Sequence, residues 1–102
     1  MTQPVQANGP TVKWTIHHDA AACRFATAAD GSKAYLEYQL DGDIFTITHT
    51  RVPEEIGGRG IAGELVRAAI EHVRANELKV EAQCSYADAW LSRHAEFAPL
   101  RA

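Results

Sequence analysis

Residues 51–65 read RVPEEIGGRGIAGEL, a glycine-rich turn that leads directly into an amphipathic helix. Ahead of the turn, residues 44–52 alternate apolar and polar side chains and predict a strand. Behind it, the apolar period predicts a helix from Gly60 or Ile61 to about Ala75. Glycines allow a close backbone approach, and the first N–H groups of a helix have no partner within it. We therefore expect the chain to bind a phosphorylated small molecule at this turn.

An Asp-Gly pair provides a second structural signal just ahead of that strand. Residues 33–40 and 43–50 alternate apolar and polar side chains on either side of Asp41-Gly42, which strongly predicts a hairpin. Weaker patterns predict the other elements: strands at 12–17, 23–27 and 78–82, a helix stop at Asn76, a short helix at 88–93 and an end to regular structure at Pro99.

This order of elements predicts an α/β protein with an α+β mixed sheet. An antiparallel meander comes first, a β-α-β unit with two parallel strands follows, and a short C-terminal helix ends the chain. We expect one folded domain over residues 12–102 and a flexible tail over residues 1–11. Ligands of such sheets bind where a strand ends and a helix begins, which is again the glycine turn.

Composition limits the class of protein. The chain has 102 residues, enough for one domain, and its net charge of -3 argues against a general nucleic-acid binder. It contains no apolar run of the ~20 residues that span a membrane, and its N-terminus has no signal-peptide pattern. We therefore expect a cytoplasmic protein with no membrane or nucleic-acid partner and no metal site. Its oligomeric state stays open.

The glycine turn has three interpretations. Residues 58–63 match G-x-G-x-x-G, but a dinucleotide-binding domain would need a longer alternation of strands and helices, and here a hairpin comes first. A tight loop without a ligand is the second interpretation, because single glycine turns before helices are common. Several closely spaced glycines with Arg59 among them favour the third, a phosphate site.

The run Gly57-Gly58-Arg59-Gly60-Ile61-Ala62 resembles motif A of the GNAT N-acetyltransferases, Q/R-x-x-G-x-G/A. Together with Tyr38, 49–53, 84–86 and 93–97, it is similar to the small YjdJ-type GNAT-like subfamily, over roughly residues 25–100. The resemblance implies a trimmed acetyltransferase core that binds acetyl-CoA and acetylates an amine, either a small molecule or a protein lysine. Gly57 departs from it, because the family usually has Gln or Arg there.

The resemblance also implies which residues contact coenzyme A. In the family, the strand before the glycine turn separates from its neighbour and offers backbone groups to the cofactor. The residues of this chain in the corresponding positions are Thr50, Arg51, Val52, Gly57, Gly58, Arg59, Gly60, Ile61, Ala62, Arg93 and His94.

Cys84, Tyr86 and His49 are the catalytic candidates. Cys84 follows a strand beside a predicted helix start, where a thiolate is stabilised, and the resemblance implies that it carries the acetyl group. Two alternatives stay open. Cys84 is a buried structural cysteine, or the amine attacks the thioester directly without a cysteine intermediate. Tyr86 is either the proton donor to the leaving thiolate or a half-buried aromatic. Strict alternation places His49 on the face of Phe45 and Ile47, either as general base or as a histidine satisfied within the sheet.

A rival function is a non-catalytic coenzyme A-binding or protein-interaction module, because a chain this short has few residues left for an acceptor site. A redox-sensing thiol protein centred on Cys84 is a further alternative. It is disfavoured because Cys23 is distant in sequence.

Overall fold

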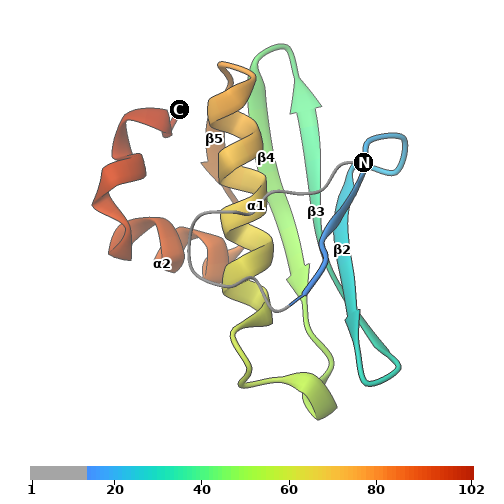
Figure 1. Cartoon of the computed structure of the whole chain (residues 1–102). Coiled ribbons are helices and arrows are strands. Elements are labelled where there is room, and N and C mark those ends of the chain that lie inside the picture. Colours follow the sequence, from blue (N-terminus) through green and yellow to red (C-terminus); the bar gives the residue numbers. More distant parts are fainter. Residues whose placement is uncertain (1–13) are drawn as a thin grey trace.

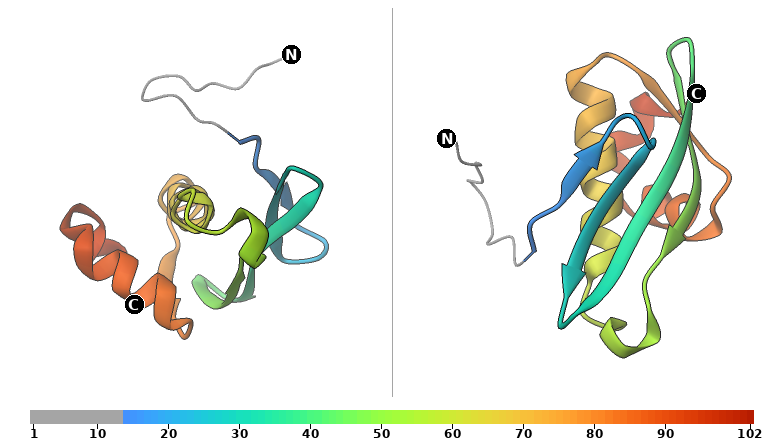
Figure 2. Two further views of the ribbon diagram at one scale, coloured as in Figure 1. Left: turned by 90° about the horizontal axis from the view of Figure 1, so that it is seen from below. Right: turned by 90° about the vertical axis from the view of Figure 1, so that its right-hand side faces the viewer.

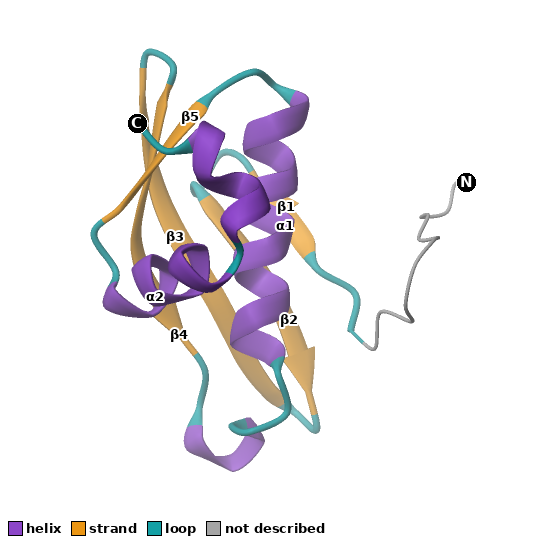
Figure 3. Ribbon diagram, turned by 90° about the vertical axis from the view of Figure 1, so that its left-hand side faces the viewer, coloured by secondary structure: helices purple, strands orange, loops and turns teal. Residues whose placement is uncertain are grey.

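The computed structural model describes residues 14–102, which form one five-stranded sheet with helices beside it (Figure 1). The long helix α1, Ile61–Ala75, lies across one face of the sheet. The shorter helix α2, Ser85–Arg93, and the 3-10 helix η2, Ala95–Leu100, lie next to the edge formed by the last strand (Figure 3). Seen end on, α1 has the sheet on one side and α2 on the other (Figure 2).

The sheet confirms the predicted mixed topology. Its strands stand in chain order; neighbours among the first four pair antiparallel, whereas β4 and β5 pair parallel across α1. The hairpin at Asp41-Gly42 is also confirmed, and Gly42 has the positive φ of +63° that its tight turn requires. The strands are β1 (His17–Asp19), β2 (Arg24–Ala29), β3 (Ser32–Asp41), β4 (Ile44–Arg51) and β5 (Lys79–Ala82), and a 3-10 turn η1 (Glu54–Ile56) follows β4.

The strand predicted at 12–17 is wrong. The first strand is His17–Asp19, which pairs with β2 from His17 onward. Just before it, the Thr15 carbonyl accepts a hydrogen bond from the Thr27 hydroxyl (2.7 Å) instead of extending the backbone ladder. The tail predicted for residues 1–11 lies outside the described residues, as does Val12.

Two further predictions near the C-terminus need correction. Helix α2 begins at Ser85 rather than Asp88, because the Cys84 carbonyl already accepts a helical hydrogen bond from the Asp88 N–H (3.0 Å). Regular structure continues past Pro99, which lies inside η2, where the fixed φ of proline is compatible with a helical turn.

The core lies between α1 and the sheet, as the apolar period of the helix predicted. Helix α1 ends as expected at Asn76, whose side-chain amide donates to the His72 carbonyl (2.9 Å). Ala34 and Leu36 of β3 point toward α1, and Tyr35 between them points to the opposite, outer face of the sheet. The largest fully buried side chains are Phe45, Leu36, Ile47, Ile56, Ile61, Leu65, Ile70, Val66, Val73 and Val80.

A bulge in β4 decides which side chains reach each face of the sheet. The register steps from Tyr38↔Ile47 to Glu37↔His49, which leaves Thr48 as an extra residue on β4. One extra residue reverses the alternation beyond it, because side chains alternate with a period of two. From His49 onward, each side chain of β4 therefore lies on the opposite face from the one that strict alternation predicts.

Within residues 14–102, no helix combines the length and the apolar character that crossing a bilayer requires.

Candidate functional site

The glycine turn has the open backbone that its sequence predicted. Gly58 and Gly60 have positive φ values of +78° and +86°, a conformation that favours glycine. A Cβ atom added at either position would meet no atom within 4 Å, so the space beside both residues is free. Gly57 differs, because its φ of -70° is ordinary and an added Cβ would approach the Glu54 carbonyl oxygen at 3.4 Å.

The N-terminus of α1 opens onto the same space. Its first ladder hydrogen bond runs from the Glu64 N–H to the Gly60 carbonyl (3.1 Å), and no side chain caps the helix at Gly60. The N–H groups of Ile61, Ala62 and Gly63 precede this ladder and carry the positive end of the helix dipole. Glycine backbone and helix terminus together form a cradle that suits an anion such as a phosphate.

Strands β4 and β5 part beside this cradle. Their last register pair is Ile47↔Ala82, and the Ile47 carbonyl accepts hydrogen bonds from the N–H groups of Gln83 and Cys84 (2.9 and 3.1 Å). Beyond that point β4 continues to Arg51, whereas the other chain turns into α2. The end of β4 therefore has an edge that no described strand covers, and Cys84 lies where the two strands separate.

Cys84 and Thr50 meet at this separation. The Cys84 thiol donates a hydrogen bond to the Thr50 hydroxyl oxygen, with Sγ and Oγ1 3.4 Å apart. The bulge makes this contact possible, because it turns Thr50 to the α1 face, where it pairs in register with buried Leu36. Cys84 also precedes α2 directly, so its side chain lies at the positive end of that helix dipole.

Tyr86 lies next to the first turn of α1. A Cβ atom added to Gly63 would be 3.4 Å from the Tyr86 hydroxyl and 3.5 Å from Trp90 Nε1. The lack of a side chain at Gly63 lets α2 approach α1 closely. The structure therefore brings the glycine turn, Thr50, Cys84 and Tyr86 together around one end of α1.

His49 does not join this group, and the prediction that it shares the face of Phe45 and Ile47 is wrong. The bulge places it on the outer face, where it pairs with Glu37 and its ring lies 6.1 Å from that of Tyr35. Arg51 pairs with Tyr35 and also points outward, while Val52 is half-buried just after the strand.

The remaining charged candidates lie at the margins. Arg59 forms an ion pair with Asp30 of the β2–β3 turn (2.6 Å), which draws its side chain toward the sheet. Arg93 is exposed in the last turn of α2. The His94 ring stacks on Trp90 at 3.7 Å, and its Nδ1 lies 2.7 Å from the Trp90 carbonyl oxygen, so this histidine also helps to close α2.

Comparison with known proteins connects this geometry to a family. A family profile of GCN5-related N-acetyl-transferases matches residues 24–100, which include the glycine turn, both ends of β4 and α2. The chain belongs to the GCN5-related N-acetyltransferase family. Family membership supports acetyl transfer as its general activity and agrees with the resemblance in motif A.

Relatives and a solved structure agree with this assignment. Protein NATD1 from Danio rerio is 34% identical over 91 residues, which cover 84% of this chain and 83% of that protein. Protein NATD1 from Mus musculus is 35% identical over 74 residues, covering 70% and 67%. The solution structure of a GCN5-like N-acetyltransferase candidate from Staphylococcus aureus superimposes with a TM-score of 0.70 at 30% identity, over 86% of this chain and 87% of that chain.

Proposed function

We propose that the chain is an N-acetyltransferase that uses acetyl-CoA and acetylates an amine. The observation that supports this most is the cradle at α1, which opens beside the only contact between a thiol and a hydroxyl among the described side-chain hydrogen bonds. An anion site next to a nucleophilic side chain suits a donor that carries a pyrophosphate at one end and a reactive acyl group at the other.

The residues of the cradle fit coenzyme A. The N–H groups of Gly58, Gly60, Ile61 and Ala62 would hold the pyrophosphate, since both glycines leave space for close approach. Backbone groups at the uncovered end of β4, Thr50 to Val52, would hold the pantetheine arm. Arg59 and the cations at the end of α2 would act at longer range.

Acetyl-CoA supplies a thioester whose carbonyl carbon accepts a nucleophile. Cys84 would be that nucleophile; its position where β4 and β5 part, at the N-terminus of α2, supports this role. The Thr50 hydroxyl would orient the thiol, and the thiol proton would pass to the departing coenzyme A sulfur with the Tyr86 phenol as relay. The amine would then attack acetylated Cys84, and the Cys84 sulfur would leave with a proton from the amine. If the amine attacks directly, the same two hydroxyls remain beside the reacting carbonyl. If that amine instead approaches from the outer face, past the uncovered end of β4, His49 would take its proton.

Two substitutions at one position test the cradle. Gly60→Asn and Gly60→Asp have nearly the same shape, and both side chains tolerate a positive φ. They differ in charge, so Asp should weaken acetyl-CoA binding by about tenfold relative to Asn through repulsion of the phosphates. Calorimetric titration of the pure protein measures this. Equal affinities in the two variants would contradict the phosphate assignment.

The chemical step is tested by following the acetyl group. Intact-protein mass spectrometry after mixing with acetyl-CoA should show one added acetyl group, which is absent in Cys84→Ala and retained in Cys23→Ala. Turnover without acetylated protein would favour direct attack by the amine. Saturable binding without any transfer to a panel of amines would instead make the chain a coenzyme A-binding module.

A further inference from the structure

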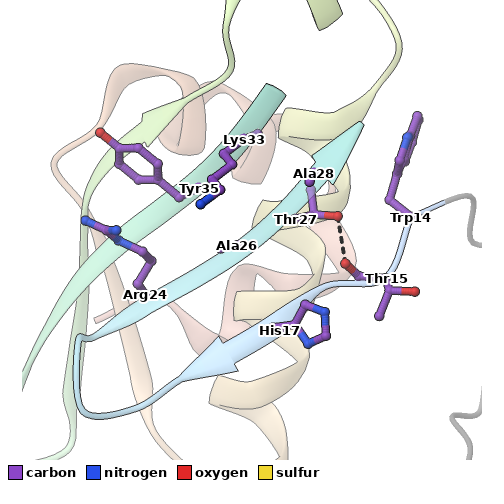
Figure 4. Close-up of a pocket in the computed structure, with 10 residues that line it drawn as sticks. Trp14, Thr15, His17, Arg24, Ala26, Thr27, Ala28, Lys33 and Tyr35 are labelled. Carbon is purple, nitrogen blue, oxygen red and sulfur yellow. Dashed lines mark hydrogen bonds between the residues drawn. The ribbon is translucent and has the colours of Figure 1, made fainter. Parts of the chain in front are cut away.

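The outer face of the sheet carries a pocket that the site at α1 does not use. Its volume is about 570 Å³, and it lies over β2 between β1 and β3 (Figure 4). Ala26 and Ala28 form its floor, because they are small side chains that follow each other on the outer face of β2. His17 of β1 and Tyr35 of β3 pair with Ala26 from opposite sides and form the walls. We call this pocket the β2 trough.

The β2 trough is positively charged, although the whole chain has a net charge of -3. Lys33 and Arg24 line it together with Tyr35. Lys33 is exposed, and no carboxylate forms an ion pair with it in the part of the chain that the structure describes. The trough therefore offers a free ammonium group beside aromatic walls, which suits an anionic ligand.

Arg24 adds a second, pre-positioned cation. Its guanidinium lies 4.4 Å from the centre of the Tyr35 ring, and one of its terminal nitrogens donates to Glu37 (2.5 Å). Its Nε is buried and has no hydrogen-bond partner among the described residues. Glu37 thus neutralises only part of this group, and the stacked ring keeps the guanidinium in place.

One wall of the trough adjoins β4. The Tyr35 wall lies 6.1 Å from the ring of His49, which is on the same outer face. The next residue, Thr50, points to the opposite face of the sheet, where it contacts Cys84. The trough over β2 therefore lies two strands away from β4, so an acceptor held in it must extend across β3 to reach the end of β4.

We propose that the β2 trough binds an anionic group of the acetyl acceptor; this inference rests on the proposed function. Arg24, Glu37 and His49 form one row across β2, β3 and β4. Strands lie about 4.8 Å apart, so the Arg24 end of the trough is about 10 Å from His49, and an anion bound by Lys33 lies at least that far away. The acceptor is therefore an extended amine with its anionic group at least about 10 Å from the reacting nitrogen.

The size of the trough favours a small molecule over a protein lysine, because about 570 Å³ lies in the usual range for small-ligand pockets. The α-amine of a free amino acid is too close to its own carboxylate to span the row. An ω-amino carboxylate has the required length, and the anion is a carboxylate or a phosphate with the same separation.

The experiment compares paired amines that differ only in the anionic group. ω-Aminobutanoate, ω-aminohexanoate and ω-aminooctanoate are each compared with the alkylamine of equal chain length, and an ω-aminoalkyl phosphate compares the two anions. We expect kcat/KM to favour the longest amino acid over its alkylamine by about fivefold, the size of one exposed ion pair.

Lys33→Gln should remove this preference without changing the rate with the alkylamine. Lys79→Gln, the same change on β5, should keep it.

A second measurement does not depend on turnover or on coenzyme A. Addition of ω-aminooctanoate should shift the NMR amide signals of Ala26, Ala28 and Tyr35 in the wild type but not in Lys33→Gln. If these shifts occur while acetyl-CoA fails to bind, the proposed function fails and the trough remains a site for anionic ligands. If no shift occurs, or if the preference survives Lys33→Gln, the trough does not bind the acceptor and this inference is overturned, whether or not acetyl-CoA binds.

Discussion

The two ends of α1 lie in opposite environments. At its C-terminal end, His72 faces a packed aromatic group in which the rings of Tyr38 and Phe45 stack at 4.1 Å and those of His18 and Phe25 at 4.2 Å. At its N-terminal end, Gly58 and Gly60 have no neighbour beside them and the first N–H groups have no cap. One end is closed by side chains, and the other leaves backbone groups free.

This difference separates stability from binding along one helix. Burial of apolar side chains is the main favourable term in folding, and at the closed end it includes the stacked rings of Tyr38 and Phe45, which lie away from the glycine turn. The backbone groups left uncovered at the open end are then available to a ligand. We therefore expect substitutions at the closed end to affect mainly the free energy of unfolding, and substitutions at the open end to affect mainly binding.

The largest expected effect is at the closed end. Phe45→Ala removes a fully buried ring that contacts Tyr38, so the free energy of unfolding should fall by about 3–5 kcal/mol. Urea denaturation of the two proteins measures this loss. At temperatures where the variant stays folded, its affinity for acetyl-CoA should equal that of the wild type.

The matched substitution at the open end is Thr50→Val, which keeps the shape of the side chain. It removes one hydrogen bond to Cys84, so it should lower the free energy of unfolding by only about 1 kcal/mol. A loss as large as that of Phe45→Ala would show that the open end also carries the stability of the fold, and the contrast between the two ends would not hold.

The next effect concerns the two cysteines, which are both half-buried. Cys84 precedes α2 and lies at the positive end of that helix, whereas Cys23 lies in the β1–β2 turn. Iodoacetamide should therefore label Cys84 about fivefold faster than Cys23. Peptide mass spectrometry of a time course gives both rates in one sample. Equal, slow labelling of the two thiols would argue against Cys84 as the nucleophile.

The sequence predicted the elements that carry a strong local signal. The Asp41-Gly42 hairpin and the long helix are confirmed because turn chemistry and apolar period each act over a few residues. The bulge at Thr48 carries no such signal, since it arises from how β4 pairs with β3. For this reason the face of His49 was predicted wrongly and the contact between Thr50 and Cys84 was not foreseen.

The β2 trough was missed for a related reason. Its parts can be found in the sequence, because Ala26 and Ala28 are two small residues at a spacing of two, and Lys33 and Tyr35 share a face of the next strand. The pocket exists only once β1 pairs on the other side, and the first strand was predicted too early in the chain. The α2 start at Ser85 likewise depends on the contact between β4 and Cys84 rather than on local propensity.

The smallest expected effect is the pH dependence of the closed end. Partial desolvation of the ring, and next the neighbouring His72, lower the pKa of His18, although the residue is still exposed to solvent; Asp19 opposes the shift. Its ring stacks on Phe25, and its Nε2 lies 2.6 Å from the Tyr38 hydroxyl. A histidine with a lowered pKa binds its proton more readily in the unfolded chain. The free energy of unfolding is therefore highest above the ordinary histidine pKa of about 6.5 and falls as the pH drops below it.

Urea denaturation between about pH 5 and pH 7.5 measures this dependence, because the range spans the ordinary histidine pKa. His18→Gln keeps a polar group beside Tyr38 but cannot titrate, so its stability should change less with pH than that of the wild type. His17→Gln is the matched control, since that ring lies on the outer face, in the wall of the trough. If the free energy of unfolding depends on pH equally in the wild type and in His18→Gln, protonation of His18 does not contribute to that dependence. Neither substitution should change the affinity for acetyl-CoA over the same range, because the groups proposed to hold the phosphates lie at the other end of α1.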